Sequence, residues 1–578
     1  MPLSTQATGT ATDRPGLADA HGADGAGAGA DGAGAGAEPP GRPRARAVIR
    51  GCADLGSGLL LLAGLLAPHE LADLTPATFL RIPLEGLLGL AFLIALPRRT
   101  ARVFGALAGV LLGLIMLGDA LDMGFYAVLR RPFDPVLDWP LARDAFGFLT
   151  SSTGTTAAIA SAVGATALAL AVLAGTIGSV MRIRRLALGH RTGATTAIAV
   201  LAGLWLAGSV MDLQTAPGTP FAATTAAESL GSRVQQLAGD LADRRAFAAE
   251  ARVDAFGSVP GHRLLTGLRG KDVMVAFVES YGRSAVQDPS MAPGVDAVLD
   301  DGTRRLRAAG FAARSGFLTS PTFGGGSWLA HSTLLSGLWI DNQQRYRTLV
   351  ASDRLTLNGA FHRAGWQTIG VMPGVTEAWP EGSFYGFDRM YDAHAMGYHG
   401  PHFSWAPMPD QYALAAHQRT ELALPRHAPV MTEIPLVSSH APWAPIPSLV
   451  GWQDVGDGSI FDPMPAAGDR PDDVWRDPAH IRTAYRESIQ YTLNTLISYL
   501  LTYGNDRTVL VFLGDHQPAT VVTGPNASHD VPVTIVARDP AVLDRVAGWH
   551  WQDGLRPGPD APVWRMDEFR DRFLTAFS

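Results

Sequence analysis

The sequence predicts a two-part protein in which five transmembrane helices precede an α/β domain with a mainly parallel sheet. Three observations lead to this fold class. Five apolar stretches, most of them close to membrane-spanning length, precede residue 213 of the 578-residue chain. Beyond about residue 260, short β-type runs alternate with helical patterns, as in sheets whose strands are joined by helices. Several of those runs end on acidic or imidazole side chains, which is typical of strands that lead into a binding site.

Composition and charge narrow the class of protein further. Hydrophobic residues make up 47% of the chain and charged residues only 17%, which is a low charge content for a purely soluble protein. The formal net charge of -7 gives no indication of a nucleic-acid partner. Cys52 is the single cysteine, so neither a disulfide framework nor a cysteine-based zinc site can form within the chain.

The N-terminal segment, residues 1–47, contains "ADGAGAGADGAGAGAEPPGRPRAR" and is rich in Gly, Ala and Pro. Such low-complexity sequence cannot bury a core, and no apolar segment follows a short basic start as it would in a secretory signal peptide. We therefore expect a disordered cytoplasmic tail.

Residues 48–213 are predicted to form the five transmembrane helices. Most of the apolar stretches approach the ~20 residues that cross the hydrocarbon core; they lie at 52–68, 78–96, 103–122, 155–180 and 194–212. Arginine-rich segments precede the first stretch, join the second to the third, and join the fourth to the fifth. The intervening loop "PHELADLTPA" is acidic and contains no arginine.

This alternation of charge predicts the orientation of the chain. Because arginine-rich loops stay in the cytoplasm, the N-terminus is cytoplasmic and everything after residue 213 lies outside. The alternation conflicts with the other interpretation of the apolar stretches, a large buried helical domain. Residues 214–258 are predicted to form an amphipathic linker helix that leads out of the membrane to a catalytic domain at 259–578.

In the C-terminal domain, three β-type runs end on carboxylate or imidazole side chains. "DVMVAFV" leads to Glu279, "PVMTEIPLVSSH" ends on His440, and "TVLVFLGDH" ends on Asp515 and His516. A single such residue indicates a turn, since Gly and Asp are common in turns. Because ligands of α/β sheets bind at the carboxyl ends of the strands, three together predict a divalent-ion site, for Mn²⁺, Zn²⁺ or Mg²⁺.

The segment "SPTFGGGSWLAHSTLLSGL", residues 320–338, supplies a candidate nucleophile. Three glycines, Gly324 to Gly326, form a flexible turn before Ser327, which opens an apolar helical stretch. A serine at a helix N-terminus is commonly an N-cap. The same position offers free backbone N–H groups to an anion, and a metal bound to the hydroxyl would lower its pKa. Ser327 is therefore either a cap or the nucleophile of a phosphoryl transfer.

Four motifs in order, "FVES", "GGGSWLAHSTLLSG", "SSHAPW" and "LGDHQP", resemble those of the alkaline phosphatase superfamily. Within it, the chain is similar to the sulfatase-like branch that includes lipoteichoic acid synthases and membrane phosphoglycerol and phosphoethanolamine transferases. The resemblance covers about 260–550 in motifs. It implies an alkaline-phosphatase-like extracytoplasmic domain, held by five spans in the membrane of a bacterial cell.

The resemblance also implies roles for individual residues. It makes Ser327 the nucleophile, His440 a contact of the transferred phosphate group, and Trp379 a neighbour of the family's substrate-binding tryptophan. Mn²⁺ is the expected ion, with Zn²⁺ or Mg²⁺ as alternatives. The implied metal ligands are Glu279, Ser327, Asp515 and His516.

Three positions depart from the family pattern. Glu381 stands where the synthases carry an arginine two residues after the tryptophan, so a glycerophosphate head group would be held differently. His331 stands where polymer synthases usually have an acidic residue. Neither the proline nor the arginine of the sulfatase formylglycine signature follows Ser327, which argues against sulfate-ester hydrolysis by that route.

From these residues we expect a membrane-bound phosphotransferase. It would move a phosphoglycerol- or phosphoethanolamine-type head group from a membrane lipid, through a covalent Ser327 intermediate, to an envelope glycan or lipid. A phosphodiesterase or phosphatase would use the same site with water as the acceptor. A third alternative, an inactive scaffold of envelope assembly, is weakened by the presence of all the implied metal ligands.

Overall fold

The computed structural model describes residues 42–423 and 428–578. Contacts divide the chain into two units, residues 1–53 and 54–578, and the second contains nearly all of the described residues. Most of the predicted disordered tail, residues 1–47, lies outside the described residues. Its last six residues begin helix α1 (Arg42–Leu66).

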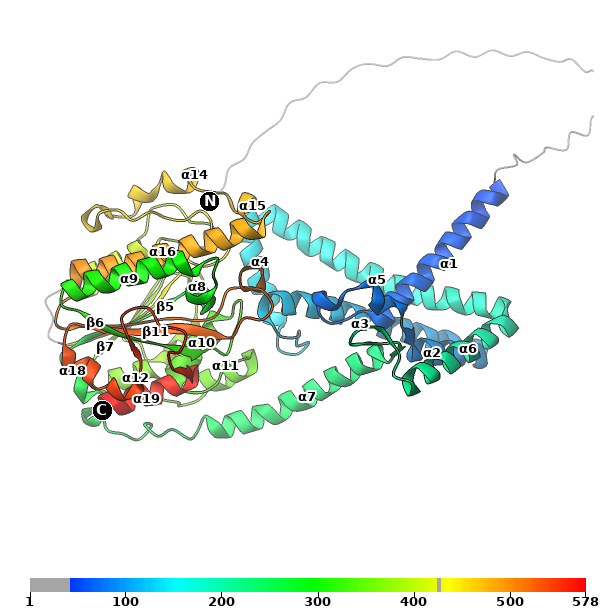
Figure 1. Ribbon diagram of the computed structural model, residues 1–578, viewed down its shortest axis with the longest axis horizontal. Helices are drawn as coiled ribbons and strands as arrows, with labels where there is room; N and C mark the ends of the chain where they lie inside the picture. The colour runs from blue at the N-terminus through cyan, green and yellow to red at the C-terminus, as the bar shows by residue number, and fades with distance from the viewer. Residues whose placement is uncertain (1–41, 424–427) are drawn as a thin grey trace, which may run out of the picture. The chain divides into compact units, whose positions relative to one another are not determined.

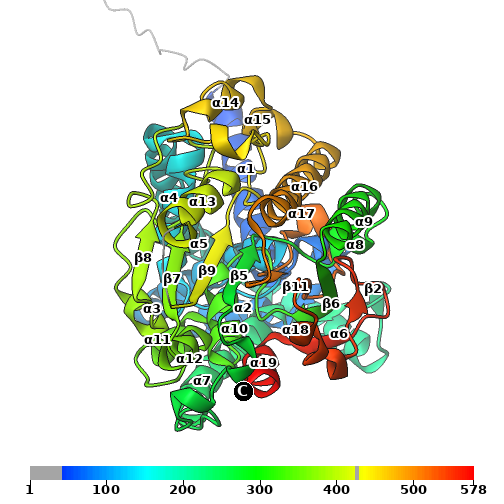
Figure 2. The ribbon, with the colours of Figure 1, turned by 90° about the vertical axis from the view of Figure 1, so that its left-hand side faces the viewer.

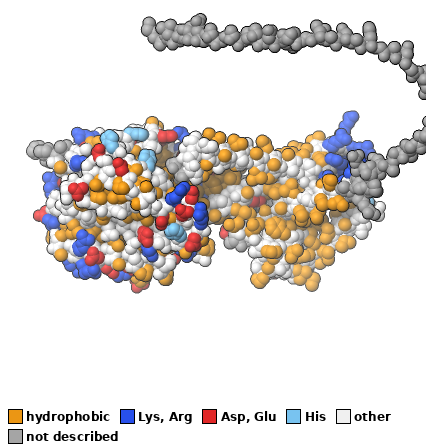
Figure 3. Space-filling view, turned by 90° about the horizontal axis from the view of Figure 1, so that it is seen from above, with side chains coloured by type: hydrophobic (Ala, Val, Ile, Leu, Met, Phe, Trp, Pro, Cys, Tyr) orange, Lys and Arg blue, Asp and Glu red, His pale blue; other side chains and the backbone are white. Residues whose placement is uncertain are grey.

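Four helices among the described residues are long and apolar enough to cross a membrane. They are α1, α3 (Arg98–Leu129), α5 (Thr155–Gly189) and α6 (Arg191–Val210). On the face drawn in Figure 3, hydrophobic side chains dominate one part of the molecule, and charged side chains are scattered over the other part.

The predicted span at 78–96 takes a different form. It overlaps the end of a 3₁₀ turn (η2, Pro76–Leu80) and includes the 12-residue helix α2 (Leu84–Ala95). Proline lacks the N–H that a helical hydrogen bond needs and is disfavoured inside a helix, and accordingly Pro76 begins η2 and Pro83 is the N-cap of α2. At 1.5 Å per residue, α2 is about 18 Å long, which is shorter than a hydrocarbon core of about 30 Å.

The predicted linker at 214–258 begins with three short strands and continues as the long helix α7 (Thr225–Glu250). The strands are β2 (Gln214–Ala216), β3 (Thr219–Pro220) and β4 (Ala222–Ala223), and β4 pairs with β1 (Ile82–Pro83). Between α3 and α5 lies the separate helix α4 (Trp139–Thr153).

The C-terminal domain is built on a sheet of nine strands within the described residues. The strands are β5 (Asp272–Val278), β6 (Ala312–Thr319), β7 (Gln367–Met372), β8 (Arg389–Asp392), β9 (Val430–Leu436), β10 (Thr508–Gly514), β11 (Asp530–Ala537), β12 (Gln552–Asp553) and β13 (Val563–Arg565). Their order is β12-β6-β11-β10-β5-β9-β7-β8, with β13 paired to β6, and Figure 2 shows much of this order across the sheet.

The sheet is mixed rather than parallel throughout. Five adjacent strands, β10-β5-β9-β7-β8, are parallel as predicted, whereas β11 pairs antiparallel with both β10 and β6. The connection from β10 to β11 carries the Asp515–His516 turn and the four-residue helix α17 (Thr520–Thr523). It lacks the long crossover helix that usually joins parallel neighbours, so β11 returns beside β10 in the opposite direction.

Helices cover both faces of the sheet (Figure 1). One face packs against α9 (Ala292–Ala308) and α16 (Pro478–Tyr503), and the other against α10 (Ser327–Ser336), α12 (Leu357–Arg363) and α19 (Phe569–Phe577). Strand β5 contributes alternate residues to the two cores, Met274 to the first and Val275 to the second. Because it is buried on both sides, β5 has the continuous apolar sequence expected of an interior strand.

The remaining helices lie in the connections of the C-terminal domain. They are α8 (Ser284–Gln287), α11 (Gln343–Val350), α13 (Asp410–His417), α14 (Met464–Ala467), α15 (Pro471–Val474) and α18 (Pro540–Asp544).

Candidate metal centre and nucleophile

The three predicted strand ends meet at one edge of the sheet. Strand β5 lies between β10 and β9, with Gly514 and Leu436 both in register with Val278. The residues after these three positions therefore emerge side by side. Glu279 follows β5, Asp515 follows β10, and the loop that carries His440 follows β9.

Asp515 serves the turn and the candidate site with different oxygens. Its Oδ1 accepts hydrogen bonds from the backbone N–H of Ser280 at 2.8 Å and of His516 at 2.7 Å. Its Oδ2 is buried and has no hydrogen-bond partner among the described residues. Buried polar atoms of native proteins nearly always have a partner, so Oδ2 is the atom that a bound ion would satisfy.

Glu279 is held by a strained turn. The next residue, Ser280, adopts a left-handed backbone conformation with φ of 58°, which is unfavourable for a residue other than glycine. The Tyr485 hydroxyl donates to the Ser280 carbonyl at 2.8 Å, and the Ser280 hydroxyl donates to Glu279 Oε1 at 3.1 Å. The Ser439 hydroxyl fixes the Glu279 carbonyl at 2.6 Å. These bonds fix the carboxylate in one position.

Ser327 is the first residue of α10 and not its N-cap. The cap position is Gly326, with φ of 81°, and the Ser327 side chain makes no capping bond. Its hydroxyl instead donates to Glu279 Oε2 at 3.0 Å and lies 3.2 Å from His516 Nε2. Of the two interpretations of this serine, the structure favours the one in which its hydroxyl belongs to the site.

His516 is oriented as a metal ligand would be. Its Nδ1 lies 2.8 Å from the Gln517 carbonyl, which can only accept, so Nδ1 carries a proton. Nε2 then faces Glu279 Oε1 at 3.3 Å and Asp515 Oδ2 at 3.6 Å. A carbonyl bond on one imidazole nitrogen, which leaves the other for the metal, is the usual arrangement of a ligating histidine.

The electrostatics of the metal-free site are those of an imidazolium between two carboxylates. Burial alone would lower the pKa of His516, but the charge of Asp515 and the hydrogen bond to Glu279 raise it to about 9. Burial and the charge of Glu279 raise the pKa of Asp515 to about 7. For Glu279, the hydrogen bond to His516 outweighs burial, and the pKa falls below its ordinary value.

These residues fit a divalent ion. The ligand atoms of Glu279, Asp515 and His516 all lie within 4.8 Å of one another, and each residue is at most 5% exposed. Two carboxylates, one imidazole and an adjacent hydroxyl suit Mn²⁺, Zn²⁺ or Mg²⁺. When bound, such an ion would supply charge stabilisation for phosphoryl oxygens.

His440 reaches the same region from the end of β9. Its ring stacks on Trp405 with centroids 3.7 Å apart, and its Nδ1 lies 2.6 Å from the Ala441 carbonyl. Burial lowers the pKa of His440, so the ring is neutral with the proton on Nδ1. Nε2 then offers a lone pair. As a contact of the transferred phosphate group, His440 would need its imidazolium form to donate from Nε2 to a phosphoryl oxygen, whereas the neutral ring can accept a proton there.

Trp379 lies elsewhere. Its indole N–H donates to the Tyr346 hydroxyl at 3.4 Å, and its ring packs on Tyr385 with centroids 5.3 Å apart. Within the described part of the chain, neither interaction reaches the candidate metal ligands. Trp405 is the tryptophan that touches His440. Sequence reasoning missed Trp405, Ser280 and Tyr485, because none lies in one of the four motifs at a position with recognisable chemistry.

A buried polar group lies behind the nucleophile helix. His331, one turn after Ser327, stacks on Phe277 with ring centroids 3.8 Å apart and lies 4.0 Å from Glu433. Asn358 donates to the Glu433 carboxylate at 2.6 Å, and burial raises the pKa of Glu433 to about 7. Burial also lowers the pKa of His331 to about 3. Both side chains are therefore uncharged between about pH 3 and pH 7.

A second group of acidic and histidine side chains is found among the described residues, and a protein cation already occupies it. His69 lies 3.3 and 3.4 Å from Asp119 and Asp122. Arg233 of α7 donates to the same carboxylates at 3.3 and 2.9 Å. This group ties the linker helix to α3.

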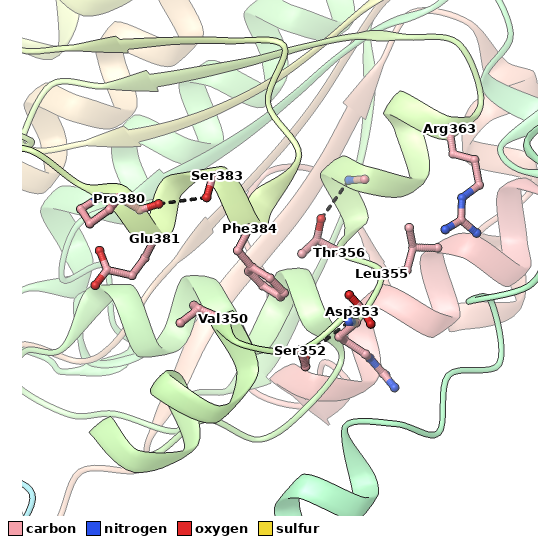
Figure 4. Close-up of a pocket in the computed structure, with 12 residues that line it drawn as sticks. Val350, Ser352, Asp353, Leu355, Thr356, Arg363, Pro380, Glu381, Ser383 and Phe384 are labelled. Atoms are coloured by element: carbon pink, nitrogen blue, oxygen red, sulfur yellow. Dashed lines mark hydrogen bonds between the residues drawn. The ribbon is translucent and has the colours of Figure 1, made fainter.

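A surface pocket of about 600 Å³ lies away from the candidate centre (Figure 4). Its polar groups are engaged in structural bonds. Ser383 donates to the Pro380 carbonyl, Arg354 pairs with Asp254, and Arg363 donates to the Gly257 carbonyl. None of the predicted site residues lines this pocket, so we do not assign it to the active site.

No family model matches the chain, and no curated protein matches it. Among solved structures, the chain is similar to the lipoteichoic acid synthase LtaP from Listeria monocytogenes. The two share 14% identity over 53% of this chain and 71% of that chain, with a TM-score of 0.35.

Two further structures are similar over comparable parts of the chain. The phosphoglycerol transferase GacH from Streptococcus pyogenes, solved with sn-glycerol-1-phosphate, shares 14% identity over 58% of this chain and 91% of that chain, with a TM-score of 0.34. The C-terminal periplasmic domain of EcEptC from Escherichia coli shares 13% identity over 53% of this chain and 82% of that chain, with a TM-score of 0.35. Because the identities and TM-scores of these matches are low, a function for this chain rests on the site residues.

Proposed function

We propose that this chain is a membrane-bound, metal-dependent phosphotransferase that uses Ser327 as its nucleophile. The observation that carries the proposal is the position of the Ser327 hydroxyl, 3.0 Å from Glu279 and 3.2 Å from His516, at the edge of the sheet where Asp515 also emerges. A serine hydroxyl that lies beside candidate metal ligands, at a helix N-terminus that favours anions, suits phosphoryl transfer.

The proposed reaction has two displacements at phosphorus. In the first, the Ser327 oxygen bonds to the phosphorus of a lipid phosphodiester, and the bond to the diacylglycerol oxygen breaks. The Ser327 proton ends on that oxygen, and a phospho-Ser327 diester remains. In the second, an acceptor hydroxyl on a glycan or lipid displaces Ser327, which recovers a proton. We assign the removal of the acceptor's proton to His440, whose bond from Nδ1 to the Ala441 carbonyl leaves the Nε2 lone pair available.

Several finer features belong to this proposal. The ion is Mn²⁺, the donor is a phosphoglycerol- or phosphoethanolamine-type membrane lipid, and the protein sits in a bacterial cell membrane. The N-terminus is cytoplasmic and the catalytic domain faces outward. Helix α2, with the preceding η2 and Pro83, would complete a fifth crossing. Anchoring keeps the site close to its lipid donor.

The experiment is an intact-mass spectrum of the full-length protein after incubation with bacterial lipids and Mn²⁺, alongside Ser327→Ala. We expect an adduct on the wild type that the variant lacks, with a mass that identifies the head group. Ser327→Ala should abolish turnover and leave thermal stability unchanged. Retained turnover in that variant would refute the mechanism. Free head group without an adduct would instead favour the hydrolase.

A further inference from the structure

A cavity of about 330 Å³ shares a wall with the nucleophile turn. We call it the loop pocket, since the segment 129–141 after helix α3 forms one side of it. Gly325, Gly326 and Trp328, which flank Ser327 in the chain, form the opposite side. Both sides belong to the single unit 54–578. A ligand in the loop pocket would thus lie within one residue of the nucleophile.

The two arginines of the loop pocket differ in their partners. The Arg131 guanidinium donates to both oxygens of Asp138 at 2.6 Å, so a carboxylate balances its charge. Arg130 donates to the Ala527 carbonyl and lies over the Phe323 ring, 5.1 Å from its centroid. Arg131 is thus engaged by an acid, whereas Arg130 keeps its positive charge.

The lining residues include more acidic than basic side chains. Two arginines face three aspartates, and burial lowers the pKa of His529, which keeps that ring neutral. The wall therefore has no surplus of positive charge to attract a phosphate group, so the anionic donor belongs at the metal centre instead. The loop pocket therefore suits a ligand without negative charge. The aspartates of the wall are Asp134, Asp138 and Asp341.

The wall also has the polar groups that hydroxyl-bearing ligands need. The hydroxyl of Thr322, a residue only 9% exposed, is buried without a hydrogen-bond partner among the described residues. A buried hydroxyl in that state indicates a missing partner. Gln343 and Gln236 supply amides, and Trp328 supplies an aromatic surface whose N–H is already bonded to Gln343 at 3.1 Å. Aromatic surface with a few placed polar groups is typical of small-molecule sites of this size.

We propose that the loop pocket binds the acceptor, a neutral polyhydroxylated molecule such as a sugar ring or a polyol. This rests on the proposed function and names the substrate class of its second step. The acceptor's hydroxyl oxygen bonds to phosphorus while the phosphorus–Ser327 bond breaks, and the acceptor's proton ends on Ser327. An occupied pocket also directs the phospho-Ser327 intermediate toward transfer rather than hydrolysis.

Two adjacent glutamines provide a matched test. Gln343 and Gln344 are both half-buried residues of α11, but only Gln343 lines the pocket, while the Gln344 amide donates to Thr348 at 3.3 Å. The first measurement requires no turnover. Saturation-transfer NMR with glucose and with glycerol is recorded on the full-length Ser327→Ala protein in detergent micelles. We expect a signal that adding Gln343→Ala weakens about fivefold, the effect of one hydrogen bond, and that adding Gln344→Ala leaves unchanged.

The second measurement uses otherwise wild-type protein with Mn²⁺, phosphatidylglycerol and the same two acceptors. Gln343→Ala should lower the fraction of head group found on the acceptor about fivefold, without slowing diacylglycerol release. Gln344→Ala should change neither quantity. Absence of a binding signal with both probes, or equal transfer fractions in the two variants, overturns the loop pocket as the acceptor site. Binding that depends on Gln343, in a protein that forms no Ser327 adduct, leaves the pocket standing and overturns the proposed function.

Discussion

Metal binding to the candidate centre should depend steeply on pH, because protons occupy the ligands of the metal-free site. The pKa of His516 is raised to about 9 by Asp515 and Glu279, and the pKa of Asp515 is raised to about 7 by burial and Glu279. Both groups must be deprotonated to bind an ion, so each competing proton weakens binding as the pH falls.

The size of the pH effect on metal affinity follows from the pKa values of His516 and Asp515. Between pH 9 and 7, only His516 must lose a proton, so affinity falls about tenfold per pH unit, or about 1.4 kcal/mol. Below pH 7, Asp515 must lose one as well, and the fall approaches about a hundredfold per unit. From pH 8 to pH 6 we therefore expect a loss of several hundredfold to about a thousandfold.

The assay is a titration of the full-length protein in detergent micelles with Mn²⁺ at pH 6, 7 and 8, with free Mn²⁺ followed by electron paramagnetic resonance. Asp515→Asn serves as the control. It should bind more weakly at every pH, and below pH 7 its affinity should fall at most about tenfold per unit, since one titrating ligand is gone and His516 loses the charge that raises its pKa. An affinity that changes less than about tenfold between pH 8 and pH 6 would refute the reasoning, because the ligands would then carry no competing protons.

Two further predictions concern the sheet around the site. A Cβ added at Gly514 would lie 1.9 Å from the Tyr281 carbonyl oxygen, so Gly514→Ala should lower stability by about 1–3 kcal/mol and weaken Mn²⁺ binding. Gly548→Ala, where an added Cβ meets no atom within 4 Å, is the control, and equal melting temperatures would contradict the prediction. Burial raises the folded-state pKa of Glu433 from 4.5 to about 7, so its stabilising effect is present below pH 4.5 and lost as the pH rises through 7. Glu433→Gln should avoid that loss, about 3 kcal/mol, and melt higher than wild type at pH 8 but not at pH 4.5; a variant that melts lower at both would show that ionised Glu433 is not penalised.

The strand ends could be predicted from the sequence, because the residues that mark each of them are adjacent in the chain. An apolar run that stops at Glu279 or at Asp515 and His516 identifies both a strand and the residues at its carboxyl end, and parallel pairing then brings these residues together. Features that depend on the path of a long connection could not be predicted from sequence patterns. Trp379 lies in the connection from β7 to β8 and Trp405 in the connection from β8 to β9, and no local pattern indicates which of them returns to His440.

The direction of β11 and the form of the second apolar stretch were missed for related reasons. A β-type run does not encode whether its neighbour is parallel, so β11 was assigned to a mainly parallel sheet although its connection to β10 contains only a four-residue helix. Hydropathy identified residues 78–96 as apolar, but Pro83 decides where the helix begins. The left-handed conformation of Ser280 depends on Tyr485, which lies on α16 more than two hundred residues away.

The arrangement of charge around Ser327 explains why the buried edge of the sheet carries the ionisable residues Glu279, Asp515 and His516. Two carboxylates and an imidazole, each at most 5% exposed, stabilise a fold poorly, since their removal from water costs about as much as their attraction returns. In the metal-free protein, the extra proton of His516 balances part of the negative charge. A divalent ion would balance it fully and release that proton. On the other side of the nucleophile turn, the loop pocket has more aspartates than arginines and so no surplus of positive charge to attract an anion. A phosphodiester is thus directed to one side of Ser327 and a neutral hydroxyl compound to the other, which is the division that a two-substrate transfer requires.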